Sequence, residues 1–288
     1  RDVLRWTPPT MSYVSEIWAS RELLQNLTNR EVRGKYRRTA LGQLWSLANP
    51  IAAILIYTFI FSFIFRLPAQ VGDPSGLNNY ALWLVCGLLP WLFFNRVLSL
   101  GTDALVSNAG LIQKVYFPRI VLPLALANAT FFTWILEMAV LVIALSLLGS
   151  FVLPWLPLVA LFMVVFALFS VGLAMVFSII NVYFRDLAYL LTIVLQFWFY
   201  LTPILYPVEL VVTQSDQLGG LIGTPVTLID VYSLNPVLGF IEIFRNLLYD
   251  NRMPEATTVV IALGWTVGAL GAGVLAYARK EKQLAELL

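Results

Sequence analysis

The chain has 288 residues, of which 60% are hydrophobic and only 12% are charged, and its formal net charge is +2. This apolar share exceeds that of a soluble domain and indicates an integral membrane protein. A single cysteine excludes an intrachain disulfide, and the absence of histidine removes the commonest general base and metal ligand. We therefore expect neither a metal site nor catalytic residues.

Six apolar runs are long enough to cross a hydrocarbon core of about 30 Å, which takes roughly 20 helical residues. They cover residues 44–65, 80–100, 121–149, 151–180, 187–206 and 257–277. The sequence predicts an all-α integral membrane protein with six transmembrane helices in one domain, residues 1–288. No cleavable secretory signal is evident in the first fifty residues, so the first span should remain in the mature protein.

The distribution of lysine and arginine predicts that both termini are cytoplasmic, since these residues gather on the inner side of short loops. With that orientation, fifteen of the 18 cationic residues fall on or near the inner face, and only Arg66, Arg245 and Arg252 fall outside. The positive charge therefore reports topology, and it does not indicate a nucleic-acid-binding protein.

A basic segment precedes the first span, and residues 16–43 are predicted to form an amphipathic interfacial helix. Thr28 and Glu31 have the spacing of a capping box, which would open a helix there. The alternative is a solvated, positively charged flank of the first span. Five cations within nine residues would also bind phosphate groups. These are Arg30, Arg33, Lys35, Arg37 and Arg38.

The stretch NAGLIQKVYFPRIVLP, residues 108–123, separates the second and third spans. Pro118 and Pro123 prevent a long helix, so about two turns are expected from Asn108 to Phe117. Exposed apolar side chains on such a short surface helix favour docking into a partner. The alternative is a loop broken by prolines.

The third span carries Glu137 near its middle. A carboxyl at that depth costs several kcal/mol unless it is paired, protonated or facing water. Glu137 is therefore either a functional residue or a neutral carboxyl that is hydrogen-bonded between packed helices. In the last span, Gly264, Gly268 and Ala272 recur every four residues and permit close helix contact.

About fifty residues separate the fifth and sixth spans, and they are more than a polar loop. Asn235 and Pro236 mark the start of a helix. This helix should run about fifteen residues, roughly 22 Å, which is too short to cross a membrane. It carries Glu242 and Arg245, which indicates a re-entrant or interfacial element buried against protein at the outer mouth of a pathway.

Motifs that would indicate ATP binding, a membrane transferase or proton coupling are missing from the sequence. The sequence has no GxxxxGK[ST] phosphate loop, so the chain cannot bind ATP by that route, and no acidic cluster suggests a membrane transferase. Proton coupling would need several ionisable groups along the spans, whereas Glu137 is nearly alone. A transporter driven by another polypeptide is the simplest interpretation.

The chain resembles the membrane subunits of ABC-2 polysaccharide exporters, which move O-antigen, capsule, teichoic acid or related cell-wall glycans. The resemblance covers essentially the whole chain, in five motifs. They are Lys35-Tyr36-Arg37-Arg38-Thr39 with Leu41-Gly42-Gln43-Leu44-Trp45, LIQKVYFPRIVLP, NVYFRDL, LTPILYP and Asn235-Pro236.

The resemblance implies that residues 108–119 form the cytoplasmic coupling helix, seated in a groove of a separate nucleotide-binding subunit. Pro118 would stiffen its joint to the third span. The coupling residues would be Leu111, Ile112, Gln113, Lys114, Val115, Tyr116, Phe117 and Arg119.

The resemblance also implies a translocation path with aromatic walls, because aromatic rings stack on the apolar faces of sugars as they do on bases. Candidates for this glycan channel are Tyr57, Phe61, Phe65, Phe197, Trp198 and Tyr200. Lipid-facing aromatic belts are the alternative explanation for these rings. A pair of re-entrant outer gate helices would occupy residues 207–254, with Asn235, Glu242 and Arg245 as gate residues.

The implied assembly is a homodimer of this permease with two copies of an ABC nucleotide-binding subunit in the bacterial inner (plasma) membrane. That subunit would hold ATP and Mg²⁺, so this chain needs no cofactor and is not itself an enzyme. The substrate would be a polyprenyl-pyrophosphate-linked glycan, whose pyrophosphate is drawn to the basic segment. The alternatives are an ABC-2 exporter of a small lipid or drug, and a proton-coupled lipid flippase acting alone.

Overall fold

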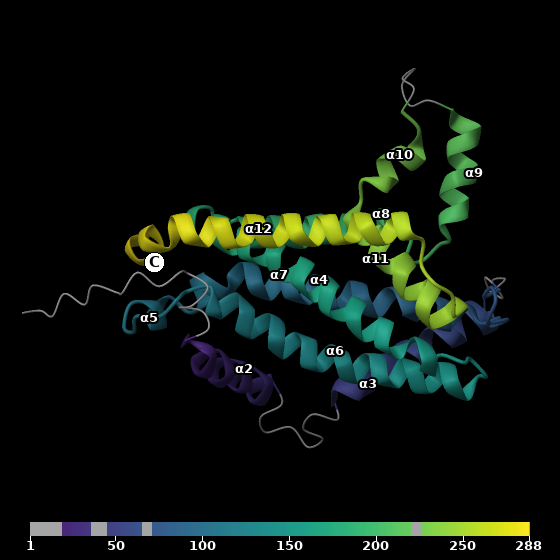
Figure 1. The fold of residues 1–288 in the computed structure, drawn as a ribbon, viewed down its shortest axis with the longest axis horizontal. Coiled ribbons are helices and arrows are strands. Elements are labelled where there is room, and N and C mark those ends of the chain that lie inside the picture. Colours follow the sequence, from purple (N-terminus) through teal and green to yellow (C-terminus); the bar gives the residue numbers. More distant parts are fainter. Residues whose placement is uncertain (1–18, 36–44, 65–70, 220–225, 288) are drawn as a thin grey trace, which may run out of the picture.

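The computed structural model describes residues 19–35, 45–64, 71–219 and 226–287, and their regular structure is helical (Figure 1). The all-α prediction is confirmed for these residues. The longest helices are α4 Tyr80–Ser107, α6 Val121–Leu147, α7 Leu156–Tyr183 and α12 Ala256–Leu287.

Four helical segments in the described part of the chain are long and apolar enough to span a membrane. They are Tyr80–Ser107, Val121–Leu147, Leu153–Tyr183 and Ala256–Glu281, the third of which includes the 3-10 turn η3 Leu153–Trp155. The other two predicted spans coincide with shorter helices, α8 Leu187–Leu201 and α3 Trp45–Tyr57. The latter continues as the π-helix η2 Thr58–Ile64.

The long helices run side by side, and α4 packs against both α6 and α7, while α12 packs along α7 (Figure 1). The closest approach uses glycine, because a Cβ atom at Gly172 of α7 would lie 2.4 Å from the backbone carbon of Ala269 in α12. A Cβ at Gly264 or Gly268 would meet open space. The predicted close contact therefore exists on α12, but at other residues than the glycine pair that the spacing suggested.

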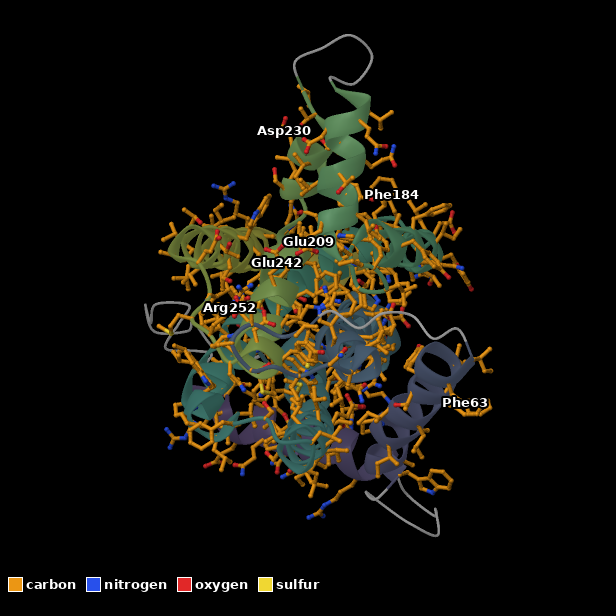
Figure 2. The ribbon with its side chains drawn as sticks, turned by 90° about the vertical axis from the view of Figure 1, so that its right-hand side faces the viewer. Phe63, Phe184, Glu209, Asp230, Glu242 and Arg252 are labelled. Atoms are coloured by element: carbon orange, nitrogen blue, oxygen red, sulfur yellow. The ribbon has the colours of Figure 1, made fainter. Side chains whose placement is uncertain are left out.

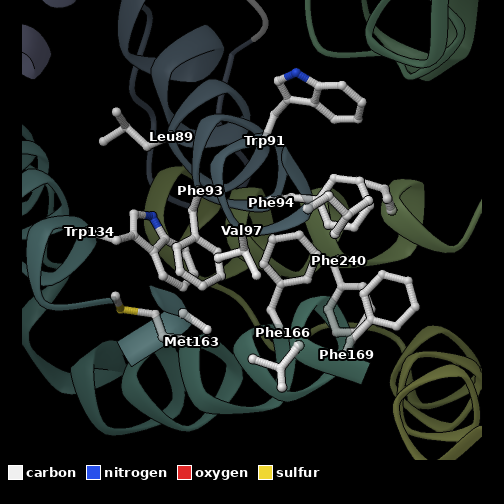
Figure 3. Packing of buried hydrophobic residues seen from close by; sticks show 14 of the residues in the cluster. Leu89, Trp91, Phe93, Phe94, Val97, Trp134, Met163, Phe166, Phe169 and Phe240 are labelled. Atoms are coloured by element: carbon white, nitrogen blue, oxygen red, sulfur yellow. The ribbon is translucent and has the colours of Figure 1, made fainter. Parts of the chain in front are cut away.

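Aromatic rings fill the core between α4, α6 and α7 (Figure 3). Phe93 of α4 stacks on Trp134 of α6 with ring centroids 4.2 Å apart. The short helix α11 Pro236–Arg245 enters the same cluster, and the ring centroids of its Phe240 and of Phe166 in α7 lie 4.7 Å apart. Close packing among these rings holds α11 against the long helices, because van der Waals contacts drive helix association within a membrane.

The N-terminal helix α2 covers Arg21–Lys35 and packs on α6. Thr28 lies inside this helix and is buried, so the predicted capping box does not open it and that prediction was wrong. Packing of Leu27 and Thr28 against the bundle outweighs the local capping signal, because burial of an apolar face supplies most of a helix's stability in a folded protein.

The two ends of the bundle differ in construction (Figure 1). One end carries α2, the single-turn helix α5 Ala109–Ile112 and the C-terminal end of α12. The opposite end carries α9 Val208–Leu218 and α10 Leu228–Ser233, which project away from the bundle (Figure 2). The π-helix η5 Asn246–Asp250 follows α11 at this end.

Candidate functional site

Residues 108–120, here called the foot, link α4 to α6. Helix α5 within the foot covers only four residues, so the predicted helix is shorter than two full turns. Backbone bonds from Gln113 to Ala109, 3.0 Å, and from Val115 to Leu111, 3.1 Å, extend the helical turn slightly. The chain is then non-helical through Phe117 and Pro118, as proline requires of the residue before it.

The foot divides into a buried part and an exposed tip. Ile112 and Phe117 are each only 6% exposed, and Leu111 is half-buried, so these three face the bundle. Val115 is 52% exposed and Tyr116 is 76% exposed, and Gln113 and Lys114 beside them are also exposed. Residues 113–116, the tip, therefore present an apolar pair and a cation to the surroundings.

Arg119 anchors the second half of the foot to the C-terminal part of α12. Its backbone N–H donates to Oε1 of Glu281 at 2.7 Å, and its Nη1 donates to the backbone carbonyl of Glu281. Arg119 is 9% exposed, so this predicted coupling residue faces its own chain. Nε of Arg119 is buried without a hydrogen-bond partner in the described part of the chain.

Arg30 of α2 anchors the first half of the foot. Its Nη2 donates to Oδ1 of Asn108 at 3.1 Å and pairs with Glu31 at 2.8 Å. Both residues line a cavity of about 440 Å³ between α2 and α4, to which Asp103 also contributes. This geometry places one of the five predicted phosphate-binding cations beside the foot.

The remaining cations of that prediction are less completely described. Arg33 is exposed on α2, one turn from Arg30. Lys35 ends α2, and its side chain lies outside the described atoms, as do Arg37 and Arg38 with their whole residues.

Glu137 of α6 forms an ion pair with Arg96 of α4, with 2.7 Å between Oε1 and Nη1. The Glu137 side chain is 1% exposed and the Arg96 side chain is 26% exposed. The Arg96 side chain is thus turned to the Glu137 carboxylate. Attraction between opposite charges offsets much of the cost of removing both from water.

The six channel candidates occupy different environments. Phe197 is 68% exposed and Tyr200 is 58% exposed, and their i, i+3 spacing puts both on one face of α8. Trp198 is half-buried, with its ring against Phe94 at 5.3 Å.

In the first predicted span, Tyr57 is half-buried. The side chain of Phe61 and the whole of Phe65 lie outside the described atoms. Among the exposed rings there, Phe59 and Phe63 stack along the π-helix with ring centroids 5.7 Å apart, and Figure 2 shows Phe63 at the periphery.

A group of polar contacts at the opposite end of the bundle centres on Arg245. We call it the Arg245 cluster, and its members are Trp83, Pro203, Ile204, Asn235 and Arg245. Its Nη1 and Nη2 donate to the backbone carbonyls of Pro203 and Ile204 at 2.7 and 2.8 Å. Its Cζ lies 3.6 Å from the ring centroid of Trp83, a cation–π contact. The guanidinium thus satisfies carbonyls that the LTPILYP segment leaves free after α8 ends.

Asn235 completes the Arg245 cluster and begins α11, as predicted. Its Oδ1 accepts from the backbone N–H of Val237 at 3.1 Å and from Nε1 of Trp198 at 2.8 Å. Its Nδ2 donates to Oγ1 of Thr202 at 2.9 Å. One side chain therefore caps α11 and also ties it to the end of α8.

Glu242 lines a cavity of about 520 Å³ beside the Arg245 cluster, together with Glu209 and Arg252 (Figure 2). Burial raises the pKa of the Glu242 carboxyl, and the nearby charge of Arg245 opposes that rise. The predicted gate residues Asn235, Glu242 and Arg245 thus lie in one region of the molecule.

Several long apolar helices, joined in one helical bundle, define a multi-pass membrane protein. The model of the family described as ABC-2 type transporter matches residues 22–249 of this chain. The chain belongs to this family.

Curated relatives cover between 66% and 95% of the chain. An O-antigen export system permease protein, RfbA, of Myxococcus xanthus is 26% identical over 273 residues, which are 95% of this chain and 98% of the relative. An RfbA of Klebsiella pneumoniae is 32% identical over 194 residues, 66% of this chain and 71% of the relative. The polysialic acid transport protein KpsM of Escherichia coli is 23% identical over 261 residues, covering 88% and 92%.

Sequence reasoning missed the partners that hold these residues in place. The sequence does not indicate that Glu281 or Trp83 would be the partner of an arginine. No spacing in the sequence connects residue 119 to residue 281, or residue 83 to residue 245. Folding brings these pairs together. The sequence signal for such a partner is the arginine itself, which lies in an otherwise apolar segment.

Proposed function

We propose that this chain is the membrane permease of an ATP-driven transporter that exports lipid-linked polysaccharide from the cytoplasm across the bacterial inner membrane. The observation that carries this proposal is the match to an O-antigen export permease over 95% of the chain. ATP hydrolysis belongs to a separate nucleotide-binding subunit, which holds ATP and Mg²⁺.

Two nucleotide-binding subunits dock on the tips of a permease homodimer. The exposure of Gln113, Lys114, Val115 and Tyr116 supports this, together with the burial of Ile112 and Phe117 behind them. A docking element needs a fixed base and exposed side chains, and exposed tyrosines are frequent among the residues that dominate binding energy. The foot has both features.

The foot end faces the cytoplasm and receives the pyrophosphate of the lipid carrier. Arg30 and Arg33 are exposed there, and Arg30 lines the cavity between α2 and α4. Their positive charge, with that of Lys35, Arg37 and Arg38, attracts a diphosphate at the membrane surface. The C-terminal end of α12 lies at the same end, which supports cytoplasmic termini (Figure 1).

The glycan crosses along aromatic side chains and leaves through the region of the Arg245 cluster. Among the candidates on α8, Phe197 and Tyr200 keep exposed rings, whereas Trp198 packs in the core. Residues 207–254 serve as the outer gate, and α11 moves little because the aromatic core holds it. The moving parts are therefore α9 and α10, which project from the bundle.

The test is reconstitution of the permease with its nucleotide-binding subunit in proteoliposomes. ATP hydrolysis and export are measured with a polyprenyl-pyrophosphate-linked glycan and, separately, with hydrophobic drugs. Stimulation by the glycan, with export into the opposite compartment, supports the proposal. Stimulation by drugs alone would instead identify an exporter of small molecules.

A proton-coupled flippase is tested in the same vesicles with Glu137→Gln. The ion pair to Arg96 argues against proton carriage, since a proton on Glu137 would leave Arg96 without its partner. The proposed function predicts continued ATP-dependent export by this variant. Export that follows an imposed proton gradient without ATP, and that stops with Glu137→Gln, would contradict it.

A further inference from the structure

The contact between the foot and α12 joins segments that are 162 residues apart. The Glu281 carboxylate accepts the backbone N–H of Arg119, and the Glu281 backbone carbonyl accepts the Arg119 guanidinium. Arg119 donates both hydrogen bonds, one from its backbone and one from its side chain, and two bonds at separate atoms restrain both translation and rotation at this joint. Because Arg119 is 9% exposed, water competes little for either bond.

The part of α12 that carries Glu281 lies beyond what a membrane span requires. The helix has 32 residues, about 48 Å at 1.5 Å each, against a hydrocarbon core of about 30 Å. The final turns therefore extend past the core at the foot end. A helix that only crossed the membrane would not need them.

This extension is also fastened to α7. Tyr277, fully buried, shares a hydrogen bond of 2.7 Å with Ser178. Two residues beyond Glu281, Gln283 accepts a hydrogen bond of 3.3 Å from the hydroxyl of Tyr183. Lys280, directly before Glu281, lies 5.9 Å from the Tyr183 ring centroid. Contacts on both sides of Glu281 thus hold the extension along the end of α7.

Farther along, α7 and α12 touch backbone to backbone. A Cβ at Gly273 would lie 2.8 Å from the carbonyl oxygen of Gly172, closer than real side chains allow. Helices in such contact cannot slide independently without a clash, so α7 and α12 move as one unit.

We propose that Glu281 is a positioning residue that couples the foot to the α7–α12 unit. A displacement of the foot is then delivered to α12 through Glu281, as well as to α6 through the chain itself. Without this joint the foot would pull on α6 alone, and helices on the two sides of α4 would not respond together. The inference rests on the proposed function, in which a nucleotide-binding subunit moves the foot.

The experiment compares Glu281→Ala, Glu281→Gln and Arg119→Ala in the reconstituted complex with its nucleotide-binding subunit. Three quantities are measured on each preparation: co-purification of that subunit, ATP hydrolysis, and glycan exported per ATP hydrolysed. Glu22→Ala is the matched control, since it removes an exposed carboxylate of α2 at the same end of the bundle.

The inference predicts that Glu281→Ala keeps subunit binding and ATP hydrolysis but lowers export per ATP by about fivefold or more, the scale of a typical coupling energy. Glu281→Gln should restore most of the ratio, because its amide oxygen can still accept the Arg119 N–H. The Glu281→Ala, Arg119→Ala double variant should be no worse than the worse single variant, since both act at one joint. Glu22→Ala should match the wild type.

An unchanged ratio in Glu281→Ala would overturn the inference while leaving the proposed function standing. Equal loss in the alanine and glutamine variants, or loss of subunit binding and melting temperature together, would also overturn it, because the residue would then be merely structural. Failure of the wild-type complex to hydrolyse ATP or export glycan would instead refute the proposed function.

Discussion

The foot and the Arg245 cluster occupy opposite ends of the bundle and use their charged residues in opposite ways. In the Arg245 cluster the guanidinium donates to two backbone carbonyls and stacks on Trp83, so its bonding serves its own chain. In the foot, Arg119 serves as an anchor, whereas Lys114 and Tyr116 point outward. Transmission of force from another polypeptide requires one end that is fixed and another end whose side chains are exposed to that polypeptide.

The largest effect should follow removal of the buried guanidinium. Arg245→Ala leaves the carbonyls of Pro203 and Ile204 unpaired and is expected to destabilise the protein by about 3 kcal/mol or more. Arg245→Lys, which can reach fewer acceptors, should lose less. Thermal melting in detergent measures the difference. If Arg245→Ala and the wild type had the same melting temperature, the Arg245 cluster would not be the fixed end that distinguishes it from the foot.

The Arg96–Glu137 pair gives the next largest effect. Glu137→Ala leaves Arg96 without its partner and should cost about 3 kcal/mol, whereas Glu137→Gln keeps a hydrogen bond and should cost less. Replacing both residues by Met and Leu should be milder than Glu137→Ala alone. Melting temperatures of the three variants test this order. If the double replacement lowered the melting temperature most, the Arg96–Glu137 pair would stabilise the fold by more than the neutralisation of two charges.

Truncation of the tip should leave folding intact and weaken docking. Tyr116→Ala is expected to reduce affinity for the nucleotide-binding subunit by about 2 kcal/mol, close to thirtyfold, with an unchanged melting temperature. Tyr189→Ala is the control, because Tyr189 is 78% exposed but lies on α8. Titration of labelled subunit onto reconstituted permease measures both. A drop in affinity shared by both variants would show that exposure alone is responsible.

The smallest effect is expected on the channel face of α8. Phe197→Ala and Tyr200→Ala should each slow glycan export severalfold, since a ring stacked on an apolar face contributes about 1 kcal/mol or more. Leu190→Ala, an exposed residue of α8 outside this pair, should not. Initial rates of export into vesicles compare the three. Rates that fall equally in all of them would favour a lipid-facing role for these rings.

The sequence predicted the helical class, the membrane location, the start of α11 at Asn235 and the position of the foot. These depend on apolar run length and on proline, which act locally. It mispredicted the capping box at Thr28, because packing of α2 against other helices outweighed the local signal. The glycines at 264 and 268 meet no other helix in the described part of this chain, so the close contact that their spacing permits stays a prediction. Pairings such as Arg119 with Glu281 leave no local pattern, since the residues meet only after the bundle has formed.

The central claim is that another polypeptide binds the tip from the cytoplasmic side. A photo-cross-linking amino acid at position 116, activated in membranes that contain the nucleotide-binding subunit, tests it directly. The account predicts an adduct with that subunit, and none from position 189. A tip that cross-links only to lipid, or a cysteine at position 116 that an impermeant reagent labels from outside the cell membrane, would contradict it.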